Sequence, residues 1–574
     1  MDHQRDRSPA QRSSRRERTQ AKRRNTVRSK TASIGVVVAG AVMALLATTG
    51  ATAGRTSQAT AVKALATNCN SNKIVVTYYS EPSVLDFQEF GTDGDNDVRA
   101  NLVGTLLSRK FVPGKAPQTT DGLTGQYTGN LASSWSLDKG TSALTFHLRQ
   151  GVKFSDGTPF TSADVKFSFV RGLEDPLSYL PSVMKILTIT SANQITTPDA
   201  NTVVFHFRKF NPFTYELMSI WATGIVSEKA VKAHATAKDP WANAWLKNNM
   251  VSTGPYMLGS ATPGVQYDFT PNPYYWDKSQ YPCNGGIIVK VTPNASDREV
   301  LIQKGGVDVA RSLDFNSIAQ LQKNSNLQVL KYSTADMREL GLNVNVKPFN
   351  NQLVRQAIAF AIPYKQILAA NFAGLASPLN SIVPPNMPTT DPATWPYSTN
   401  LAKAKQLLKQ AGFASGFSTT LYTRSGDSED QKASVLIQES LAKIGVKVTI
   451  QTLLTAAYAA RQFNQRDMPM FFWDWISFTN DPYYDFTFLA QCKQGTNYAN
   501  YCNPTVDSLI AKGMYEPNAA KRASISQQIQ KLVATGAADI GLGTPDSIVV
   551  MGKNIHGWNQ QVDLNARYYT LWKS

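Results

Sequence analysis

Histidine and cysteine are scarce in this chain, which limits the metal sites that it can build. The 574 residues include 5 histidines and 4 cysteines. His3, His234 and His556 have no spacing that could bind a metal, and no C-x-x-C or H-E-x-x-H motif occurs. His147 and His206 lie in predicted strands, where we expect structural imidazoles. We therefore predict that the protein holds no metal.

Motifs for phosphate binding and nucleophilic catalysis are missing as well. The chain has no G-x-x-x-x-G-K-[ST] loop and no G-x-S-x-G elbow. The glycines of GLTGQYTG, residues 122–129, have the wrong spacing for a dinucleotide turn. With 41 Asp and Glu residues, a carboxylate pair for hydrolysis stays open, although no motif singles one out. We predict no cofactor and no enzymatic activity, with a secreted hydrolase as the alternative.

Acidic residues are outnumbered by basic ones, but the excess is local. The chain has 58 Lys and Arg residues and a net charge of +17. Such a charge can indicate a nucleic-acid partner. However, residues 1–30 alone contain 11 Arg or Lys against 3 Asp or Glu, and charges are scattered over the rest. We therefore predict no nucleic-acid partner.

The basic start precedes residues 31–54, which carry no charge. Their apolar part, IGVVVAGAVMALLA at 34–47, has the length of a signal-peptide h-region. Small residues at 51–53 and at 64–66 offer two cleavage sites. An uncleaved membrane anchor is the alternative, although Gly, Ala and Thr make the run weakly hydrophobic. We predict an exported, extracytoplasmic protein that is secreted or associated with the cell surface.

All four cysteines follow this segment, and an even number in an exported chain suggests disulfides. Cys492 and Cys502 close a short polar loop, CKQGTNYANYC, so we predict that they pair. Cys69 and Cys283 are then the second pair. Lipid attachment at Cys69 is an alternative, although LATNC departs from a lipobox, and any one cysteine could instead be a buried thiol.

Strand and helix patterns alternate along the chain, which predicts an α/β or mixed protein. The predicted strands are 73–80, 143–149, 202–208, 287–291, 307–310, 340–346, 446–453 and 471–476. The predicted helices are 97–108, 161–173, 296–304, 351–361, 365–372, 400–411, 434–444 and a helical region at 505–535.

One long stretch has a recognisable signature. LASSWSLDKGTSALTFHLRQGVKFSDGTPFTSADVKFSF, residues 131–169, contains Leu-Ala-x-x-Trp, a strand ending in Phe-x-Leu-Arg, and Lys-Phe-x-Asp-Gly-x-Pro-Phe-Thr-x-x-Asp-Val. This resembles the bacterial extracellular solute-binding proteins of family 5, the dipeptide- and oligopeptide-binding type subunits of ABC importers. EPSVLD, STGPY and NPYYW follow the family's order, and matches run from about residue 74 to 515.

The resemblance implies a two-lobe, periplasmic-binding-protein-like fold of type II, cluster C, with an extra subdomain in lobe one. The expected division is 1–66 basic n-region, signal peptide and linker, 67–118 lobe one, 119–224 extra subdomain, 225–332 lobe one, 333–540 lobe two, and 541–574 the return to lobe one.

The function that the resemblance implies is that of a solute receptor. A monomer would capture a peptide, a peptide-like solute or another organic solute between its lobes by hinge closure, then deliver it to ABC permease subunits. A sensory receptor with the same fold is an alternative. Within the receptor class, a non-peptide ligand such as an oligosaccharide stays open.

The stretch FFWDWISFTNDP, residues 471–482, resembles the cleft segment Trp-x-x-Asp-x-x-Asp/Glu-Pro of peptide-binding relatives. In those relatives the first Asp pairs with the peptide's amino group. Here Trp475 and Asp481 match, but Phe478 stands at the anchor position. A phenyl ring cannot pair an ammonium, although its face attracts cations. We therefore expect no ordinary free-amine anchor.

Asp474 is an uncertain replacement for the anchor. In a strand, Asp474 and Trp475 point to opposite faces, and the sequence leaves open whether Trp475 and Phe478 belong to the cleft or to the core. The predicted ligand contacts from this segment are Trp475, Phe478, Thr479, Asn480 and Asp481. From segment position alone we add Phe90, Thr92, Asp93 and Asn380.

Overall fold

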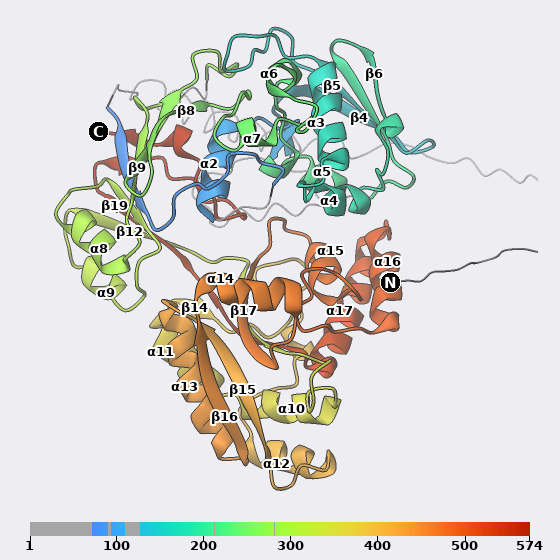
Figure 1. Ribbon diagram of the computed structural model, residues 1–574, viewed down its shortest axis with the longest axis vertical. Coiled ribbons are helices and arrows are strands. Elements are labelled where there is room, and N and C mark those ends of the chain that lie inside the picture. The colour runs from blue at the N-terminus through green and yellow to red at the C-terminus, as the bar shows by residue number, and fades with distance from the viewer. Residues whose placement is uncertain (1–71, 90–92, 110–126, 212, 280–281) are drawn as a thin grey trace, which may run out of the picture. The chain divides into compact units, whose positions relative to one another are not determined.

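The computed structural model describes residues 72–89, 93–109, 127–211, 213–279 and 282–574, which belong to one compact unit (Figure 1). The predicted signal segment, Cys69, Phe90 and Thr92 lie outside these ranges. Among the helices of the described ranges, none is long and apolar enough to cross a membrane.

A seven-stranded sheet contains the first described strand. Its order is β12–β19–β11–β1–β10–β9–β8. β1 is parallel to β10 and β11, and the outer pairs are antiparallel. The strands are β1 (Ile74–Tyr78), β8 (Tyr256–Thr262), β9 (Gln266–Pro271), β10 (Ile287–Val291), β11 (Val309–Arg311), β12 (Leu327–Tyr332) and β19 (Ser547–Gly552).

A six-stranded sheet has the order β14–β18–β13–β17–β15–β16. β17 is antiparallel to β13 and parallel to β15, so it is an interior strand. The strands are β13 (Asp336–Leu342), β14 (Ala376–Ser377), β15 (Phe417–Arg424), β16 (Val446–Leu453), β17 (Met470–Ile476) and β18 (Asp539–Pro545). Helices α10, α12 and α13 pack their buried faces on a core formed with these strands (Figure 1).

Three smaller sheets complete the strands. A four-stranded sheet has the order β4–β5–β7–β6, and α3 packs against β6 and β7. Its strands are β4 (Ala132–Asp138), β5 (Ala143–Leu148), β6 (Ile195–Asp199) and β7 (Thr202–His206). The two-stranded sheets are β2 (Leu107–Arg109) with β3 (Tyr127–Gly129) and β20 (Ile555–His556) with β21 (Trp572–Lys573).

The helices fall between these strands. The first eight are α2 (Asp93–Leu102), α3 (Ser162–Glu174), α4 (Leu180–Ile186), α5 (Phe213–Leu217), α6 (Glu228–His234), α7 (Asn243–Leu246), α8 (Ala295–Gln303) and α9 (Ile318–Leu321). The next eight are α10 (Gln352–Ala361), α11 (Tyr364–Phe372), α12 (Leu401–Gln410), α13 (Ser428–Ala442), α14 (Thr455–Ala459), α15 (Pro482–Asp485), α16 (Pro504–Met514) and α17 (Ala519–Gly536).

Short 3-10 and π segments also occur. They are η1 (Ala192–Gln194), η2 (Trp221–Thr223), η3 (Pro392–Thr394), η4 (Ala460–Gln465), η5 (Phe486–Ala490) and η6 (Tyr568–Thr570).

The chain passes between the two large sheets at two adjacent places. It leaves the seven-stranded sheet after β12 and enters the six-stranded sheet at β13, and it returns between β18 and β19. The hydroxyl of Thr334 donates to the carbonyl of Pro545 at 2.6 Å and ties the two crossings together. The expected division after residue 540 falls within β18.

Most of the strands and helices that the sequence predicts lie within one or two residues of those observed, and the differences have local causes. The helix expected at 434–444 begins at Ser428 instead, because Asp427 caps it by accepting from the amide of Asp430 at 2.9 Å. The helix expected at 97–108 begins at Asp93, where an acidic first turn favours the helix dipole, and it ends at Leu102. The strand expected at 340–346 runs instead from Asp336 to Leu342. It ends there because the Asn343 side chain accepts from the amide of Asn345 at 3.1 Å and forms a turn.

The helical region expected at 505–535 is two helices rather than one. α16 ends at Met514, and α17 begins at Ala519. Asn518 caps α17 by accepting from the amide of Lys521, and Pro517, one residue before this cap, disfavours helical continuation. α3 begins after its N-cap Thr161, whose amide donates to Asp164 Oδ2 at 2.9 Å in a capping box.

Candidate functional site

β17 and the residues after it divide their side chains between two environments. Successive side chains of a strand point to opposite faces. Asp474, Ile476 and Phe478 line a cavity of about 510 Å³. The two residues between them, Trp475 and Ser477, point the other way and donate hydrogen bonds to one buried carboxylate, that of Asp485. The strand predicted at 471–476 therefore separates a cavity face from a packing face.

Trp475 belongs to the packing face. Its indole Nε1 donates to Asp485 Oδ1 at 2.9 Å, and the Ser477 hydroxyl donates to the same oxygen. The ring lies 5.7 Å from Tyr484 and 5.9 Å from Phe488, measured between centroids. Burial raises the pKa of Asp485 to about 7, and the two donors lower it by less.

Residues 479–481 are buried beneath this loop. Asp481 forms a two-pronged ion pair with Arg522, at 3.0 and 2.9 Å, and accepts from the amide of Tyr483 at 2.9 Å to cap α15. Thr479 and Asn480 are 0% and 3% exposed. These three residues support the loop that carries Phe478, and their predicted ligand contacts stay predictions.

Both large sheets and both crossings contribute to the cavity. Of the predicted ligand residues that the structure describes, Phe478 lines it. Its ring is 6.0 Å from Trp221 and 6.5 Å from Tyr484, between centroids. The lining from the seven-stranded sheet and its loops includes Tyr78, Tyr79, Arg311 and Leu313, and the lining from the crossings includes Thr334 and Asp546.

Arg424, the last residue of β15, binds three carboxylates. Its Nη1 is 2.8 Å from Asp474 Oδ1, its Nη2 is 2.9 Å from Asp427, and its Nε is 3.2 Å from Asp430. Asp474 therefore faces the cavity while its carboxylate is already paired with Arg424. Although desolvation raises its pKa, Arg424 and Arg338 lower it more, so the pKa of Asp474 falls below the ordinary value.

Arg338, on β13, binds two more carboxylates. It pairs with Asp336, and its Nε lies 3.4 Å from Glu429 Oε2. The pairing of β13 with β17 places Arg338 opposite Asp474, which joins the two groups. We call Asp336, Asp427, Glu429, Asp430 and Asp474, together with Arg338 and Arg424, the acidic wall.

Burial shifts the titration of this wall. Desolvation is the largest influence on Asp430, and with the charge of Asp427 it raises the pKa of Asp430 to about 8. Desolvation likewise raises the pKa of Asp336 to about 7, against the opposing effect of Arg338. The pKa of Glu429 is raised for the same reason. The carboxylates are thus crowded beyond what two guanidinium groups neutralise.

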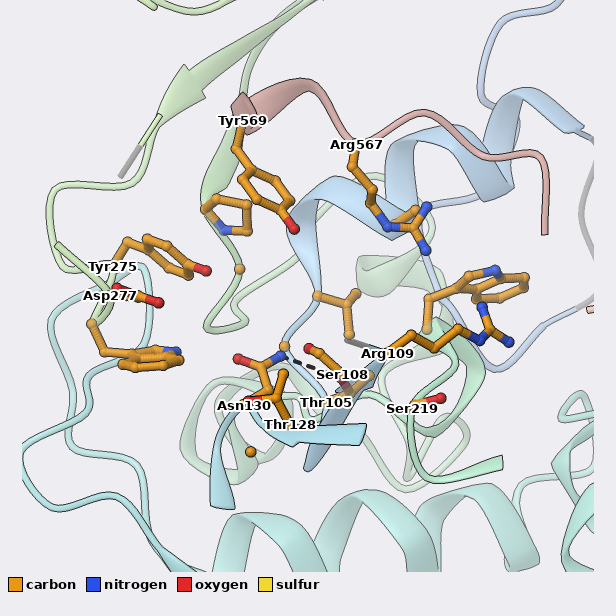
Figure 2. Close-up of a pocket in the computed structure, with 18 of the residues that line it drawn as sticks. Thr105, Ser108, Arg109, Thr128, Asn130, Ser219, Tyr275, Asp277, Arg567 and Tyr569 are labelled. Atoms are coloured by element: carbon orange, nitrogen blue, oxygen red, sulfur yellow. Dashed lines mark hydrogen bonds between the residues drawn. The ribbon is translucent and has the colours of Figure 1, made fainter. Parts of the chain in front are cut away.

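A second polar cavity, of about 420 Å³, is lined by residues of α2, β2, β3 and the C-terminal segment. Figure 2 shows Arg109, Arg567, Tyr569 and Asn130 around it. Arg109 Nε donates to Glu216 at 2.8 Å, and its Nη2 donates to the carbonyl oxygen of Phe478. Arg109 therefore fixes the backbone of the residue that lines the first cavity, although no sequence motif marks it.

The remaining predicted residues have varied placements. Asp93 is the first residue of α2, and Asn380 is exposed in the loop after β14. Phe90 and Thr92 lie outside the described ranges, so their ligand contacts stay predictions. Sequence reasoning did not identify Arg338, Arg424 or the other members of the acidic wall apart from Asp474, because no motif marks them.

The predicted pairing of Cys492 with Cys502 is confirmed, with a Cα–Cα distance of 4.5 Å. Cys283 is buried and disulfide-bonded. Cys69 lies outside the described residues, so the pair that it was predicted to form stays a prediction. Among the described residues, no group of three or more His, Cys, Asp or Glu side chains could hold a metal ion.

Two sheets joined by paired crossings, with a cavity lined from both, define the class of two-lobed solute-binding proteins. A family model for the bacterial extracellular solute-binding proteins, family 5, middle region, matches residues 126–497. The chain belongs to this family, and it is an extracytoplasmic solute receptor of the kind that serves ABC importers.

Individual relatives agree with this assignment. The chain is 27% identical over 441 residues to the glutathione-binding protein GsiB of Shigella dysenteriae, covering 75% of this chain and 82% of the relative. It is 28% identical over 448 residues to the probable D,D-dipeptide-binding periplasmic protein DdpA of Escherichia coli, covering 76% and 84%.

Solved structures show the same fold. The periplasmic binding protein DppA of Helicobacter pylori, in complex with the peptide STSA, superposes with a TM-score of 0.77 at 24% identity, covering 88% of this chain and 98% of that one. This likeness establishes the two-lobed fold of the family 5 type, as the sequence predicts.

Proposed function

We propose that this receptor captures a peptide or peptide-like solute in the 510 Å³ cavity and delivers it to ABC permease subunits. The observation that carries the proposal is the alternation along β17. Asp474, Ile476 and Phe478 face a cavity that both sheets line. A solute that contacts both walls stabilises the closed arrangement of the two sheets, because its binding energy favours that state over the open one.

The N-terminal segment fits this role. Residues 1–66 have the composition of an export signal followed by a linker, which would bring the receptor to the outside of the membrane, where importers collect their solutes. Relatives whose names state glutathione and D,D-dipeptides support a peptide-like ligand. We propose that lobe two ends at the second crossing, after β18, and that no catalytic step is involved.

We also propose that the solute's α-ammonium is not anchored at position 478. Phe478 presents a ring where the resembling receptors have a carboxylate, and Arg109 and the ring of Trp221 hold it in place. A buried ammonium needs acceptors that a phenyl ring lacks. Peptides with blocked or modified ends and other organic solutes therefore suit this position better than free-amine peptides.

Titration calorimetry with a library of di- to pentapeptides, each free and N-acetylated, tests this proposal. We expect the wild-type chain to bind at least one peptide whose affinity survives N-acetylation. The variant Phe478→Asp should gain affinity for free-amine peptides by about tenfold, as a buried charge-assisted pair forms. Wild-type binding that vanishes on N-acetylation would contradict the preference for blocked or modified ends. No gain in Phe478→Asp would contradict the assignment of position 478 as the missing amine anchor.

A further inference from the structure

Carboxylates outnumber cations on one side of the cavity. The acidic wall contains five carboxylates and two guanidinium groups, joined by direct contacts. All but Asp430 line the cavity. The wall therefore presents a negative field to any solute, and its two arginines act mainly as bridges that hold the carboxylates together.

The charged groups that face this wall from other elements do not offset its negative charge, because two are carboxylates and Arg311 already pairs with Asp97. Arg311 lies on β11, Asp546 in the second crossing, and Asp563 in the C-terminal segment, and all three line the cavity. Their pairs are Arg311 with Asp97, Asp546 with Lys331, and Asp563 with Arg567. The excess of negative charge on the acidic wall is thus left for a solute to meet.

A small recess beside Glu429 supplies an unused acceptor. The recess measures about 150 Å³ and shares Phe315, Ser428 and Glu429 with the main cavity. Asn371 lines it and is 5% exposed. Its Nδ2 donates to the carbonyl of Glu429 at 3.1 Å, while its Oδ1 has no hydrogen-bond partner in the part of the chain that the structure describes.

A buried carbonyl oxygen without a partner is costly, and it is satisfied by a hydrogen-bond donor. Lys432, an exposed residue of α13, and Asp314 also border the recess, so a solute group would meet one cation and several acceptors there. Aromatic rings complete the surroundings, because Tyr78, Tyr79 and Phe478 line the main cavity, and Arg311 already lies over the ring of Tyr78 at 4.8 Å from its centroid. Their faces attract cations.

We propose that the receptor selects a solute carrying an ammonium or guanidinium group, which lies against Asp474, Asp336 and Glu429. The inference rests on the proposed function, since it assigns a ligand class to the same cavity. The acidic wall has more carboxylates than arginines, and the solute's cation pairs with the carboxylate charge that the arginines leave uncompensated. The cation's N–H donors also match the Oδ1 of Asn371, a residue that borders the recess, since this buried oxygen is unpaired within the described ranges.

The binding should depend on pH in a defined direction. The raised pKa values of Asp336 and Asp430, about 7 and 8, mean that these carboxyls take up protons as the pH falls from 8.5 to 6. Protonation removes the negative charge that attracts the cation. Affinity for a cationic solute should therefore weaken over this interval, whereas affinity for an uncharged analogue should change little.

A matched peptide library tests the proposal. Each tripeptide is N-acetylated and made with lysine, Nε-acetyl-lysine or glutamate at one position, so that the lysine ammonium is the only cation. Calorimetry on the exported chain should give at least tenfold tighter binding for the lysine forms at pH 8.5. The preference should shrink at least threefold at pH 6.

Two variants locate the cation and one controls for the substitution. Asp474→Asn and Asp336→Asn should each reduce the lysine preference at least fivefold, with thermal unfolding recorded to confirm folding. Asp467→Asn is the matched control, because Asp467 is an exposed carboxylate that pairs with Arg461 and does not line the cavity. It should leave the preference unchanged. The two test residues lie on different strands. If one variant fails to fold, the other still tests where the cation binds.

The outcomes separate this inference from the proposed function. Equal binding of the three peptide forms, or tighter binding of the glutamate forms, overturns the cationic class while leaving a peptide receptor in place. Binding of lysine forms that both Asn variants preserve overturns the assigned location. Absence of binding by every form overturns both the cationic class and the peptide-like ligand.

Discussion

At the scale of single residues, a carboxyl group lies on each side of β17, and their different partners give them different pKa values. Asp474 shares its charge with Arg424 at the edge of a cavity, so it stays ionised. Asp485 is fully buried behind the same strand and receives only neutral donors from Trp475 and Ser477. Without a cation to compensate burial, Asp485 prefers to be neutral.

The raised pKa of Asp485 makes the free energy of unfolding depend on pH. Its folded pKa of about 7 lies above the unfolded value, so the folded state binds the extra proton. Its stabilising contribution is therefore complete below about pH 4 and is lost as the pH rises through 7. The variant Asp485→Asn mimics the neutral form, and from pH 5 to 8 the wild-type free energy of unfolding should fall by roughly 2 kcal/mol relative to it.

Urea unfolding of wild type and Asp485→Asn at pH 5, 6, 7 and 8 measures this difference. Asp467→Asn provides the control, because that carboxylate is exposed and paired, and its curve should follow the wild type. Parallel pH profiles for wild type and Asp485→Asn would contradict the assignment of a raised pKa.

At the scale of elements, the loop after η5 is fixed by covalent and capping contacts. The Cys492–Cys502 bond closes it, and the amide of Cys492 donates to Asp507 Oδ1 on α16 at 3.0 Å. α16 in turn packs against α17, whose Arg522 binds Asp481. The loop that carries Phe478 is thus connected to the disulfide through two helices.

Replacing both cysteines by serine should destabilise this region. Closing a loop of 10 residues restricts the unfolded chain, and its loss costs about 3 kcal/mol in the chain-entropy model. Thermal unfolding should show a lowered midpoint for the double variant under oxidising conditions. Ser508→Ala, on the exposed side of α16, is a local control and should unfold like the wild type. An unchanged midpoint in the double variant would argue that the bond adds nothing.

Local features of the site can be predicted from the sequence, whereas long-range contacts cannot. The alternation of β17 is a local property, so the opposite directions of Asp474 and Trp475 follow from the sequence. The sequence does not show which of these two side chains faces the cavity, because that depends on the pairing of β17 with β13 and on the position of the other sheet. Arg338 and Arg424 are distant in sequence and join Asp474 only in the folded chain, so no spacing could reveal the acidic wall.

At the scale of the whole molecule, two crossings link the sheets that enclose the cavity. The Thr334–Pro545 hydrogen bond keeps the crossings adjacent. Paired crossings of this kind are where lobes hinge when a receptor closes around a solute. Contacts on both sides of the cavity let a solute favour one arrangement. The family, the fold and the cavity are therefore all those of a solute-binding receptor. The acidic wall favours solutes that carry a positive charge.

Native mass spectrometry of the protein purified from its own host, without unfolding, tests this account most directly. We expect one solute per chain, released on denaturation and identified as a peptide-like or other organic molecule that carries a positive charge. A chain that carries no solute, binds none of the matched peptides and instead converts added peptides to products would contradict it.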